Sequence, residues 1–434
     1  MGAVTQSDRY HALDSLRGFA MFLGILIHAV ISFMLKPPSF WPVRDNDPNP
    51  LADLFLFAVH DFRMQTFFLL AGFFGCLLFQ RYGLRSMLMH RVRRIAIPFV
   101  LAVLLIVPPL QAIWLYGEIE AFRAEGVPDH DPSPVRILAA ELVAADPTQS
   151  TAAIIGKFFQ SGRFLTGLAP IHLWFLYYLL WCYTTIAGVV VIANRLAESR
   201  LERKTDAAFR TLMQSRFRVL IPACATVPMM YTMKSWYVDT PENWFPKWNL
   251  LAYYFGFFVF GWMLYRHRDL VQSFGRGWKW ILPVANFLVL PAMIGLTISG
   301  LESSTTRKGP IVIPQEWLPT VKFAAFSAAS LYTWLMIVGM WGAFLALFST
   351  PRAWVRYLAD ASYWCYIASL APTLVLQMLV ANWPLPGVMK LLFVVVATMA
   401  ILLVSYEWCV RYTAIGAVLN GRKYRTPVPS HDAG

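Results

Sequence analysis

Ten apolar stretches recur along the 434 residues of the chain, and each is long enough to cross a bilayer as a helix. A helix needs about 20 mainly apolar residues to span a hydrocarbon core that is about 30 Å thick. Only helices and closed barrels satisfy their backbone hydrogen bonds there. The ten stretches are 13–35, 52–80, 95–117, 172–194, 219–238, 249–265, 280–299, 320–348, 357–381 and 387–410. We therefore predict an all-α integral membrane protein, a bundle of about ten transmembrane helices.

The composition argues against a soluble protein. Hydrophobic residues make up 58% of the chain and charged residues 14%, whereas soluble proteins have about 45–50% and about 25%. The five cysteines lie in apolar stretches without metal-ligand spacing, so we expect neither a disulfide framework nor a metal site. Walker, dinucleotide-binding and zinc-protease motifs are missing from the sequence. Their absence argues against ATP-driven transport, nicotinamide chemistry and metalloprotease activity.

The net charge of +13 indicates membrane topology rather than a nucleic-acid partner, because the basic residues gather in alternate loops. One set of loops, together with the chain ends, holds 24 Lys and Arg, and the other set holds 9. Cytoplasmic loops carry the excess of Lys and Arg, so we place both termini in the cytoplasm and 118–171 outside. We expect one domain over 1–425 and a short cytoplasmic tail at 426–434. The apolar spacing of 134–146 predicts a helix on the membrane surface.

Ionisable side chains inside the apolar stretches indicate a candidate site, because such groups are costly in lipid and usually functional. Arg17 and His28 are eleven residues apart in the first stretch, which puts them on one helix face about 16 Å apart. His60 and Arg63 share a face of the second stretch, and His60 reaches a depth similar to that of His28. We predict that these two imidazoles and Arg63 meet at one level. The alternative is that these groups only hydrogen-bond each other between helices.

Two further groups of residues stand at helix ends. Arg91 and Arg94 begin the third predicted helix on the cytoplasmic side, where Arg17 also lies. Positive-inside topology alone would explain them, but planar guanidinium groups also suit phosphate. His172 and Trp174 open the fourth predicted helix at the outer face. They are candidates for substrate contact, or they form only an interfacial aromatic anchor.

These residues resemble the pattern of membrane acyltransferase family three, the integral-membrane O-acyltransferases of bacterial envelopes and some eukaryotes. Arg17 and His28 match the family's first-helix pattern of Arg, ten residues, then His. Arg91 and Arg94 match its Arg-x-x-Arg at the third helix. The stretches that look closest to the glucan-biosynthesis protein C branch, thought to succinylate periplasmic glucans, are 60–74, 172–180, 357–367 and 410–425. The chain departs from the family at Ser369, where many members carry a histidine, and this leaves the choice of substrate open.

The resemblance, combined with the residues, implies a mechanism. Acyl-coenzyme A (succinyl favoured, acetyl next) would dock its phosphates on the three arginines, and its pantetheine arm would lie along the Met21–Gly24 face. His28 would deprotonate a hydroxyl of a periplasmic glucan as general base. His60 and Arg63 would orient His28 or stabilise the oxyanion. Direct transfer and an acyl-histidine intermediate both fit.

The resemblance also implies the setting, an inner membrane of a bacterium. The expected partners are membrane lipids and a periplasmic glycan acceptor, with no nucleic acid and no metal, and a homo-oligomer is left open.

A transporter or flippase for a glycan or lipid precursor is the alternative from another class, because buried His and Arg in a proline-rich bundle are also typical of transporters. No inverted repeat is visible in the sequence, which weakens this alternative. Among acyltransferases, the acceptor can instead be a lipopolysaccharide or an exopolysaccharide. Turnover of acyl-coenzyme A by purified protein without a gradient separates the two classes.

Overall fold

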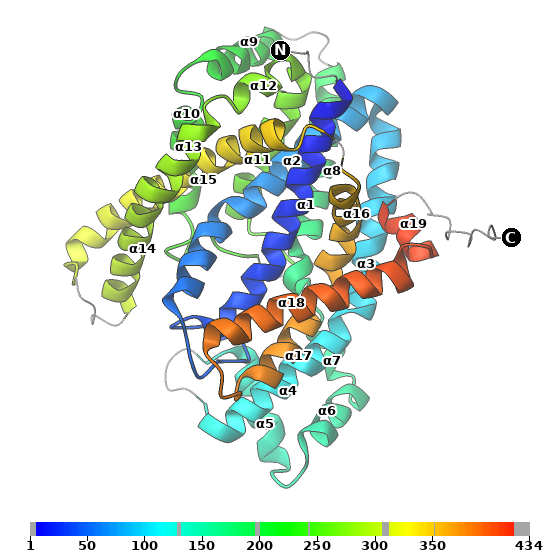
Figure 1. The fold of residues 1–434 in the computed structure, drawn as a ribbon, viewed down its shortest axis with the longest axis vertical. Coiled ribbons are helices and arrows are strands. Elements are labelled where there is room, and N and C mark those ends of the chain that lie inside the picture. Colours follow the sequence, from blue (N-terminus) through cyan, green and yellow to red (C-terminus); the bar gives the residue numbers. More distant parts are fainter. Residues whose placement is uncertain are drawn as a thin grey trace, which may run out of the picture. The chain divides into compact units, whose positions relative to one another are not determined.

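The computed structural model describes residues 6–127, 132–195, 200–241, 244–305, 312–350 and 352–420. This part of the chain is helical and contains no strand (Figure 1). Two compact units interleave along the sequence. Unit 1 comprises Met1–Leu23, Asp53–Arg91 and Pro170–Arg356, and unit 2 comprises Gly24–Ala52, Val92–Ala169 and Tyr357–Gly434.

Unit 1 is built around the long helix α15, against which α10, α13 and α14 pack. Its α-helices are most of α1 (Gln6–Val30) and of α2 (Pro50–Arg91), α8 (Trp174–Arg195), α9 (Arg200–Gln214), α10 (Leu220–Tyr231), α11 (Trp248–Arg266), α12 (Val271–Phe274), α13 (Trp278–Val284), α14 (Leu290–Thr305) and α15 (Leu318–Leu347). Shorter pieces are η3 (Ile171–Leu173), η4 (Arg268–Leu270), η6 (Gln315–Trp317) and the π-helix η5 (Ala285–Val289).

Glycines let two helices of unit 1 touch backbone to backbone. A Cβ atom on Gly72 of α2 would lie 1.9 Å from the carbonyl oxygen of Phe258 in α11. A Cβ atom on Gly261 of α11 would lie 1.8 Å from the carbonyl oxygen of Leu69 in α2. Small residues at such crossings are the usual way in which membrane helices associate. The part of α2 that follows His60 and Arg63 is therefore in direct backbone contact with α11.

Unit 2 holds the end of α1, most of α16 and the helices of two further segments, 92–169 and the C-terminal part of the chain. They are η1 (Ile31–Phe33), the π-helix η2 (Val92–Ala96), α3 (Ile97–Leu105), α4 (Val107–Glu125), α5 (Pro134–Ala145), α6 (Thr151–Gln160), α7 (Arg163–Thr166), α16 (Ala353–Ala368), α17 (Leu370–Val380), α18 (Gly387–Ser405), the π-helix η7 (Tyr406–Val410) and α19 (Ala414–Asn420). The predicted tail at 426–434 lies outside the described residues.

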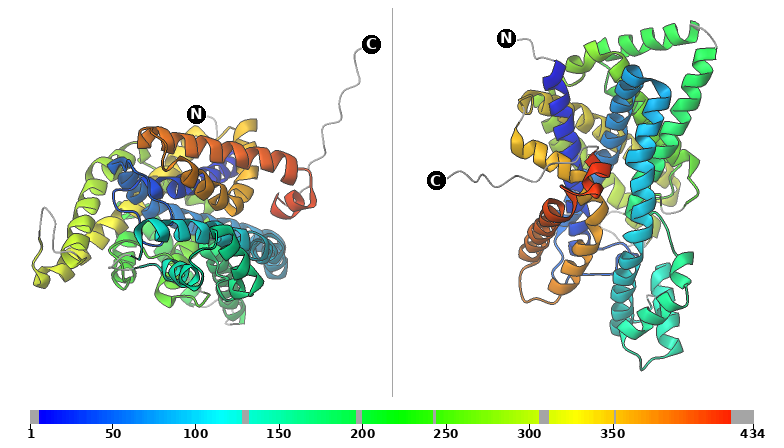
Figure 2. Two further views of the ribbon diagram at one scale, coloured as in Figure 1. Left: turned by 90° about the horizontal axis from the view of Figure 1, so that it is seen from below. Right: turned by 90° about the vertical axis from the view of Figure 1, so that its right-hand side faces the viewer.

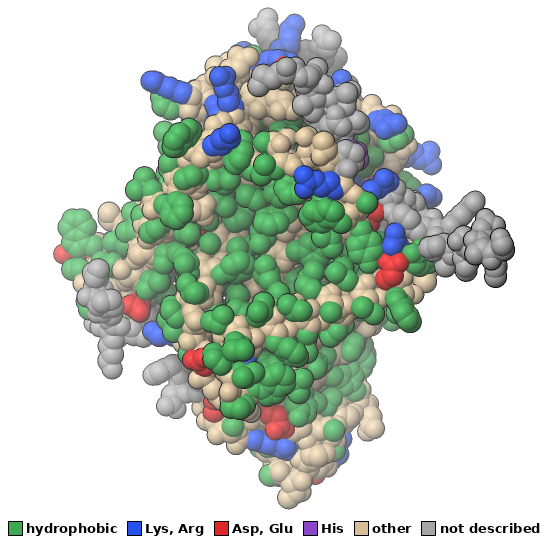
Figure 3. All heavy atoms as spheres, in the orientation of Figure 1, with side chains coloured by type: hydrophobic (Ala, Val, Ile, Leu, Met, Phe, Trp, Pro, Cys, Tyr) green, Lys and Arg blue, Asp and Glu red, His purple; other side chains and the backbone are tan. Residues whose placement is uncertain are grey.

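The described residues contain six helices that are long and apolar enough to cross a membrane. These are His11–Phe33, Pro50–Leu105, Arg163–Arg195, Trp278–Ser304, Gln315–Leu347 and Gly387–Val410. A seventh span results if α16 and α17, which are bent by 68° against each other, are taken as one. Large apolar side chains stay exposed on these helices, as Leu392, Val396 and Val404 do on α18, and Figure 3 shows hydrophobic side chains along this helix. These features are those of a membrane protein.

The number of ten spans is not confirmed, because three of the predicted stretches do not form long apolar helices of their own. The stretch 95–117 is divided between α3 and α4, which are separated by a break at Ile106 ahead of Pro108 and Pro109. The stretch 219–238 is helical only over the 12 residues of α10. The stretch 249–265 forms α11, whose many Trp and Tyr residues lower its hydropathy.

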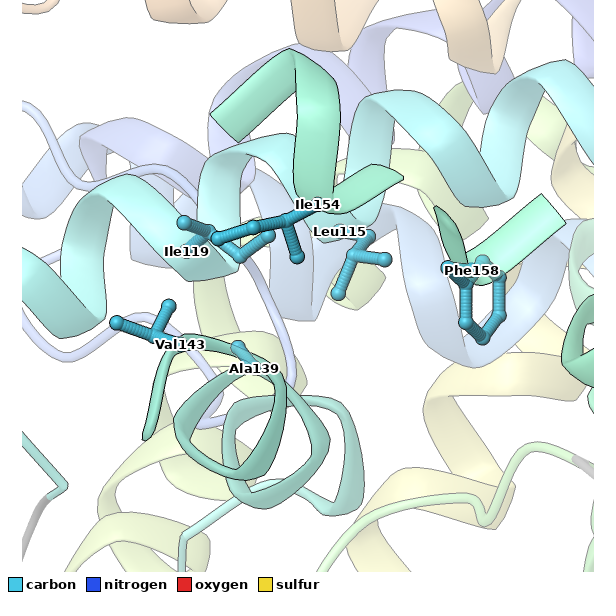
Figure 4. Packing of buried hydrophobic residues seen from close by; sticks show 6 residues of the cluster. All are labelled: Leu115, Ile119, Ala139, Val143, Ile154 and Phe158. Atoms are coloured by element: carbon cyan, nitrogen blue, oxygen red, sulfur yellow. The ribbon is translucent and has the colours of Figure 1, made fainter. Parts of the chain in front are cut away.

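The segment 118–171 is largely helical, and the predicted helix at 134–146 is present as α5. Part of its apolar face packs against protein, whereas Ile137 stays exposed, and its place at the membrane surface stays a prediction. Ala139 and Val143 pack into a cluster with residues of α4 and α6 (Figure 4), namely Leu115, Ile119, Ile154 and Phe158. Figure 2 shows α5 and α6 beside the end of α4.

A buried ion pair ties α5 to α4. Arg136 Nε lies 2.5 Å from Glu118 Oε2, and both side chains are buried. Ser133 caps α5 by accepting a hydrogen bond from the backbone N–H of Arg136, and its hydroxyl donates to Glu118. Glu118 and Arg136 lie in a segment that we predicted to be a loop outside the membrane. In the structure they contact each other inside unit 2.

Candidate functional site

The first helix carries both residues of the Arg-x10-His pattern. Helix α1 runs without interruption from Gln6 to Val30, so the spacing of Arg17 and His28 places them on one face about 16 Å apart. Arg17 is 44% exposed and forms an ion pair with Asp14 at 3.2 Å. It also lies over the ring of Phe74, 5.8 Å from the centroid. The arginine is thus held by α1 and α2 within unit 1 while much of its guanidinium stays accessible.

His28 is surrounded by a set of specific contacts in unit 2. Its imidazole stacks on the ring of Trp41, with centroids 6.2 Å apart and planes at 24°. Gln377 of α17 donates from Nε2 to the carbonyl oxygens of His28 and Ala29, both at 2.9 Å. Trp41 Nε1 donates to Gln377 Oε1 at 3.2 Å and to Ser32 Oγ at 3.0 Å. The backbone of His28 and one face of its ring are therefore both fixed.

These contacts have a simple cause. The last carbonyl groups of a helix have no partner within the helix, and in an apolar environment an unpaired carbonyl is costly. Gln377 satisfies two of these carbonyls at the end of α1. Because a carbonyl only accepts and an indole N–H only donates, the amide of Gln377 can take only this orientation. Gln377 thus connects the backbone of His28 to the indole of Trp41.

The helix that carries Gln377 begins at the position where the sequence departs from the family pattern. Ser369 lies at the break between α16 and α17, where the two helices are bent by 68°. Its side chain is buried and donates to the carbonyl oxygen of Tyr366 at 3.4 Å. Its own carbonyl accepts a hydrogen bond from Thr373 Oγ1 at 2.8 Å. Ser369 therefore occupies the bend as a compact, internally bonded residue.

His60 and Arg63 lie together on α2 in unit 1. His60 Nε2 is 2.9 Å from the carbonyl oxygen of Val238, and its ring meets Tyr237 edge-on at 6.1 Å. Since a carbonyl oxygen only accepts, Nε2 must carry the hydrogen, and Nδ1 is the basic atom of the neutral ring. Arg63 is close enough to His60 for their charges to interact. The shared face predicted for this pair is present.

Arg91 is the most sheltered of the predicted phosphate-binding arginines. Its guanidinium lies over the ring of Tyr183, 4.6 Å from the centroid. Its Nε and Nη2 atoms are buried and have no hydrogen-bond acceptor among the described residues. Arg17 lies close enough for the two charges to interact. Two nearby guanidinium groups, one with unused buried donors, fit an anionic ligand such as a phosphate.

Arg94 belongs to unit 2 and to the π-helix η2, directly after the end of α2. Its carbonyl oxygen accepts a hydrogen bond from the hydroxyl of Tyr363 in α16 at 2.9 Å. π-Helical turns are rare and frequently lie at functional sites. We predicted that Arg91 and Arg94 begin a regular α-helix. The π-helical turn between them changes the angle at which their side chains leave the helix.

His172 lies in η3 and Trp174 begins α8, both in unit 1, and both side chains are buried. Trp174 packs among aromatic rings, namely those of Phe68, Tyr178 and Tyr254. The residue before His172, Ile171, has a φ of 45°, which is strained for a β-branched side chain. Packing among these rings is sufficient to explain the position of Trp174. The strained backbone of Ile171, next to His172, is of a kind that is often found at functional sites.

The structure thus brings together some of the predicted residues. Arg17 lies near Arg91, and His60 lies near Arg63, all within unit 1. His28 and Arg94 belong to unit 2. The meeting of His28 with His60 and Arg63, and that of Arg94 with the other arginines, stay predictions.

Three residues around the predicted site were not found from the sequence. Gln377 is an uncharged polar residue inside an apolar stretch, and a search for such residues would have found it. Trp41 lies in a connecting segment that has no periodic pattern. Tyr183 is one of many aromatic residues in its helix, so that its position under Arg91 could not be read from the sequence.

The described part of the chain is an all-helical membrane protein. Its first helix carries the partly exposed Arg17 and His28, whose ring stacks on Trp41 and whose carbonyl is bonded to Gln377. It belongs to a family of membrane acyltransferases: the family model described as "Acyltransferase domain" matches residues 10–407. The chain is 34% identical over 138 residues to glucans biosynthesis protein C of Escherichia coli (strain SMS-3-5 / SECEC), covering 32% of this chain and 34% of the relative. It is 38% identical over 103 residues to the protein of that name from Shigella dysenteriae serotype 1 (strain Sd197), covering 24% and 26%.

The matched regions span about a third or less of these curated relatives. No solved structure matches the chain.

Proposed function

We propose that this membrane acyltransferase moves an acyl group from cytoplasmic acyl-coenzyme A to a hydroxyl group of a glucan on the periplasmic side of a bacterial inner membrane. The family match over 10–407 carries the proposal. The name of the relatives supports a glucan as acceptor. Succinyl is the favoured acyl group and acetyl the next. The proposal includes ten spans with both termini in the cytoplasm.

The donor binds first to the arginines. Arg17 and Arg91 hold phosphate groups of coenzyme A, supported by the unused buried donors of Arg91, and Arg94 adds a third charge. The pantetheine arm then follows α1 from Arg17 toward His28. The distance of about 16 Å along the helix is the length that this arm must cover.

His28 is the general base of the transfer. It takes the proton of the acceptor hydroxyl, whose oxygen attacks the carbonyl carbon of the thioester. Arg63 stabilises the tetrahedral oxyanion, and His60, whose Nε2–H donates to the carbonyl oxygen of Val238, orients the site. When the bond between carbon and sulfur breaks, His28 returns the proton to the departing thiolate. His172 and Trp174 are proposed to contact the acceptor.

Purified full-length protein in detergent tests this function without any gradient. It is expected to convert succinyl-coenzyme A and a linear glucan into free coenzyme A and an acylated glucan, detected by mass spectrometry. Acetyl-coenzyme A serves as the competing donor. Binding of glucan without any acyl transfer from either donor would contradict the proposal and favour a transporter.

A further inference from the structure

An uncompensated pair of arginines lies where two turns of unit 1 meet, and nothing in the acyl-transfer reaction uses it. Arg218 stands in the turn before α10, and Arg276 in the turn before α13. Arg218 Nη2 donates to the carbonyl oxygen of Arg276 at 2.6 Å. The Nε of Arg218 is buried and has no acceptor among the described residues. Partial burial, and next the charge of Arg276, lower the pKa of Arg218.

The turn that holds Arg276 is fixed by close backbone packing. A Cβ atom on Gly275 would lie 2.4 Å from the Cα atom of Gly342 in α15. Gly277 has a φ of 86°, in the left-handed region that favours glycine. The carbonyl that orients Arg218 is therefore part of a rigid turn, which holds the guanidinium of Arg218 against the backbone of Arg276 and close enough for the two charges to interact.

Neighbouring basic residues of unit 1 are neutralised, whereas this pair is not. Arg210 binds Asp269 at 2.8 Å, and Arg266 binds Glu202 and Asp206. No ion pair joins Arg218 or Arg276 to an acidic residue in the described part of the chain. Two like charges close together without an internal counter-charge favour the binding of an external anion, because an opposite charge nearby stabilises both charged forms.

The surface beside the pair is suited to lipid chains. Exposed apolar residues follow directly on both sides, Phe217, Leu220 and Ile221 at α10 and Trp280 and Val284 on α13. Trp280 is 80% exposed, and an exposed tryptophan at the end of a membrane helix is typical of the interface with the headgroups. Figure 3 shows Lys and Arg side chains beside hydrophobic ones in the region of α10 and α13.

We propose that Arg218 and Arg276 bind the phosphate group of a membrane phospholipid whose acyl chains lie along the apolar residues of α10 and α13. Planar guanidinium groups bind phosphate through paired, charge-assisted hydrogen bonds. Basic sites between helices at the cytoplasmic surface commonly hold anionic headgroups. Phospholipid is favoured over a soluble phosphate because the charged pair and the exposed apolar residues adjoin.

Native mass spectrometry of the full-length protein in detergent tests this site. Wild-type protein is expected to retain an anionic phospholipid, for example phosphatidylglycerol, whereas R218Q/R276Q is expected to lose at least about tenfold in affinity, equivalent to about 1.4 kcal/mol. The matched control is R203Q/K204Q, which removes two charges from the exposed face of α9. R276Q alone keeps the hydrogen bond to the carbonyl of residue 276, and it is expected to weaken binding without loss of folding.

Two competitors identify the ligand. Diacylglycerol, which has no phosphate, is expected not to displace the bound phospholipid, and inorganic phosphate or coenzyme A is expected to displace it only weakly. Equal phospholipid retention in R276Q and wild type would contradict the proposal. Displacement by coenzyme A at concentrations as low as those of phospholipid would contradict it as well, because the pair would then bind a soluble phosphate compound.

Discussion

His28 is held by hydrogen bonds to its backbone and by an aromatic contact with its ring. Gln377 holds the carbonyl groups of His28 and Ala29, and so fixes where α1 ends. Trp41 covers one face of the imidazole and is itself bonded to Gln377. A general base must be held within hydrogen-bond reach of the proton that it takes. We interpret Gln377 and Trp41 as positioning residues for His28.

Replacing Gln377 with leucine tests this interpretation. The change keeps the approximate size of the side chain but removes the hydrogen bonds that Gln377 donates to the carbonyls of His28 and Ala29. It also leaves the indole N–H of Trp41 with Ser32 as its acceptor. We expect kcat to fall about tenfold or more, with little change in KM for the donor, because misplacement of a catalytic group acts on the chemical step. Q111L is the matched control, since Gln111 also bonds carbonyl groups of unit 2, those of Phe164 and Gly167. Equal effects of both changes on kcat would remove Gln377 from the positioning of His28.

Arg91→Gln tests the donor site. Loss of a charge-assisted contact worth about 1.5–3 kcal/mol is expected to raise the KM for acyl-coenzyme A about tenfold or more. An acyl-pantetheine without the nucleotide is expected to be used equally well by the variant and the wild type. Arg93, which is exposed on the same turn, provides the control R93Q. Similar losses with both donors would show that Arg91 does not bind phosphate.

The sequence predicted charged residues of this site better than uncharged ones. An ionisable residue in an apolar stretch is conspicuous, so His28, His60 and Arg63 could be selected from the pattern alone. The hydrogen bonds of Gln377 join residues that are more than 300 positions apart, and no periodicity encodes such a contact.

At the scale of elements, a buried ion pair connects the segment after α1 to the start of α18. Lys390 Nζ lies 2.7 Å from Asp45 Oδ1, and both side chains are 1% exposed. Asp47 in the same segment accepts a hydrogen bond from the backbone N–H of Gly387 at 2.7 Å. These contacts attach α18 to the segment that contains Trp41. Lysine inside an apolar stretch was visible in the sequence, but its partner was not.

The pair predicts a non-additive response to mutation. K390M alone leaves a buried carboxylate without its counter-charge, and we expect a loss of about 3–5 kcal/mol in stability. The double variant K390M/D45N removes both charges and is expected to recover much of this loss. Thermal unfolding in detergent measures both. As a control, R163Q breaks the exposed pair with Glu141 and is expected to cost about 0–1 kcal/mol. Additive losses in the double variant would show that the two charges do not interact.

The approximate positions of the helices could be predicted because the apolar stretches are long. The residues at which the helices begin and end could not. Helix α2 continues past the predicted end of its stretch to Arg91, with a change of direction at Gly83, where φ is 77°. Only glycine adopts this conformation at little cost. Gly83 lies after the predicted stretch 52–80, in a segment whose apolar pattern does not show that the helix continues. Of the helices in 118–171, α5 was predicted from its apolar spacing, whereas α6, α7 and the end of α4 were not. The sequence did not show that Glu118 and Arg136 are buried against each other.

At the scale of the whole molecule, the distribution of Lys and Arg predicts that 118–171 is periplasmic and 195–218 cytoplasmic. The structure identifies suitable probe positions, because Thr148 and Thr205 are exposed, whereas Ser133 is a buried helix cap. In a variant without native cysteines, Thr148→Cys is expected to react with an impermeant thiol reagent in intact cells and Thr205→Cys only after lysis. The reverse pattern would invert the topology and with it the direction of transfer.

The central claim is that the protein transfers an acyl group across the membrane with His28 as the general base. Proteoliposomes with labelled acyl-coenzyme A outside and glucan trapped inside test it most directly. Wild-type protein whose cytoplasmic face is outward is expected to acylate the trapped glucan. His28→Ala is expected to fold and bind donor normally but to lose about two to four orders of magnitude in transfer rate. Folded His28→Ala protein that acylates the trapped glucan at a near-normal rate would contradict the account.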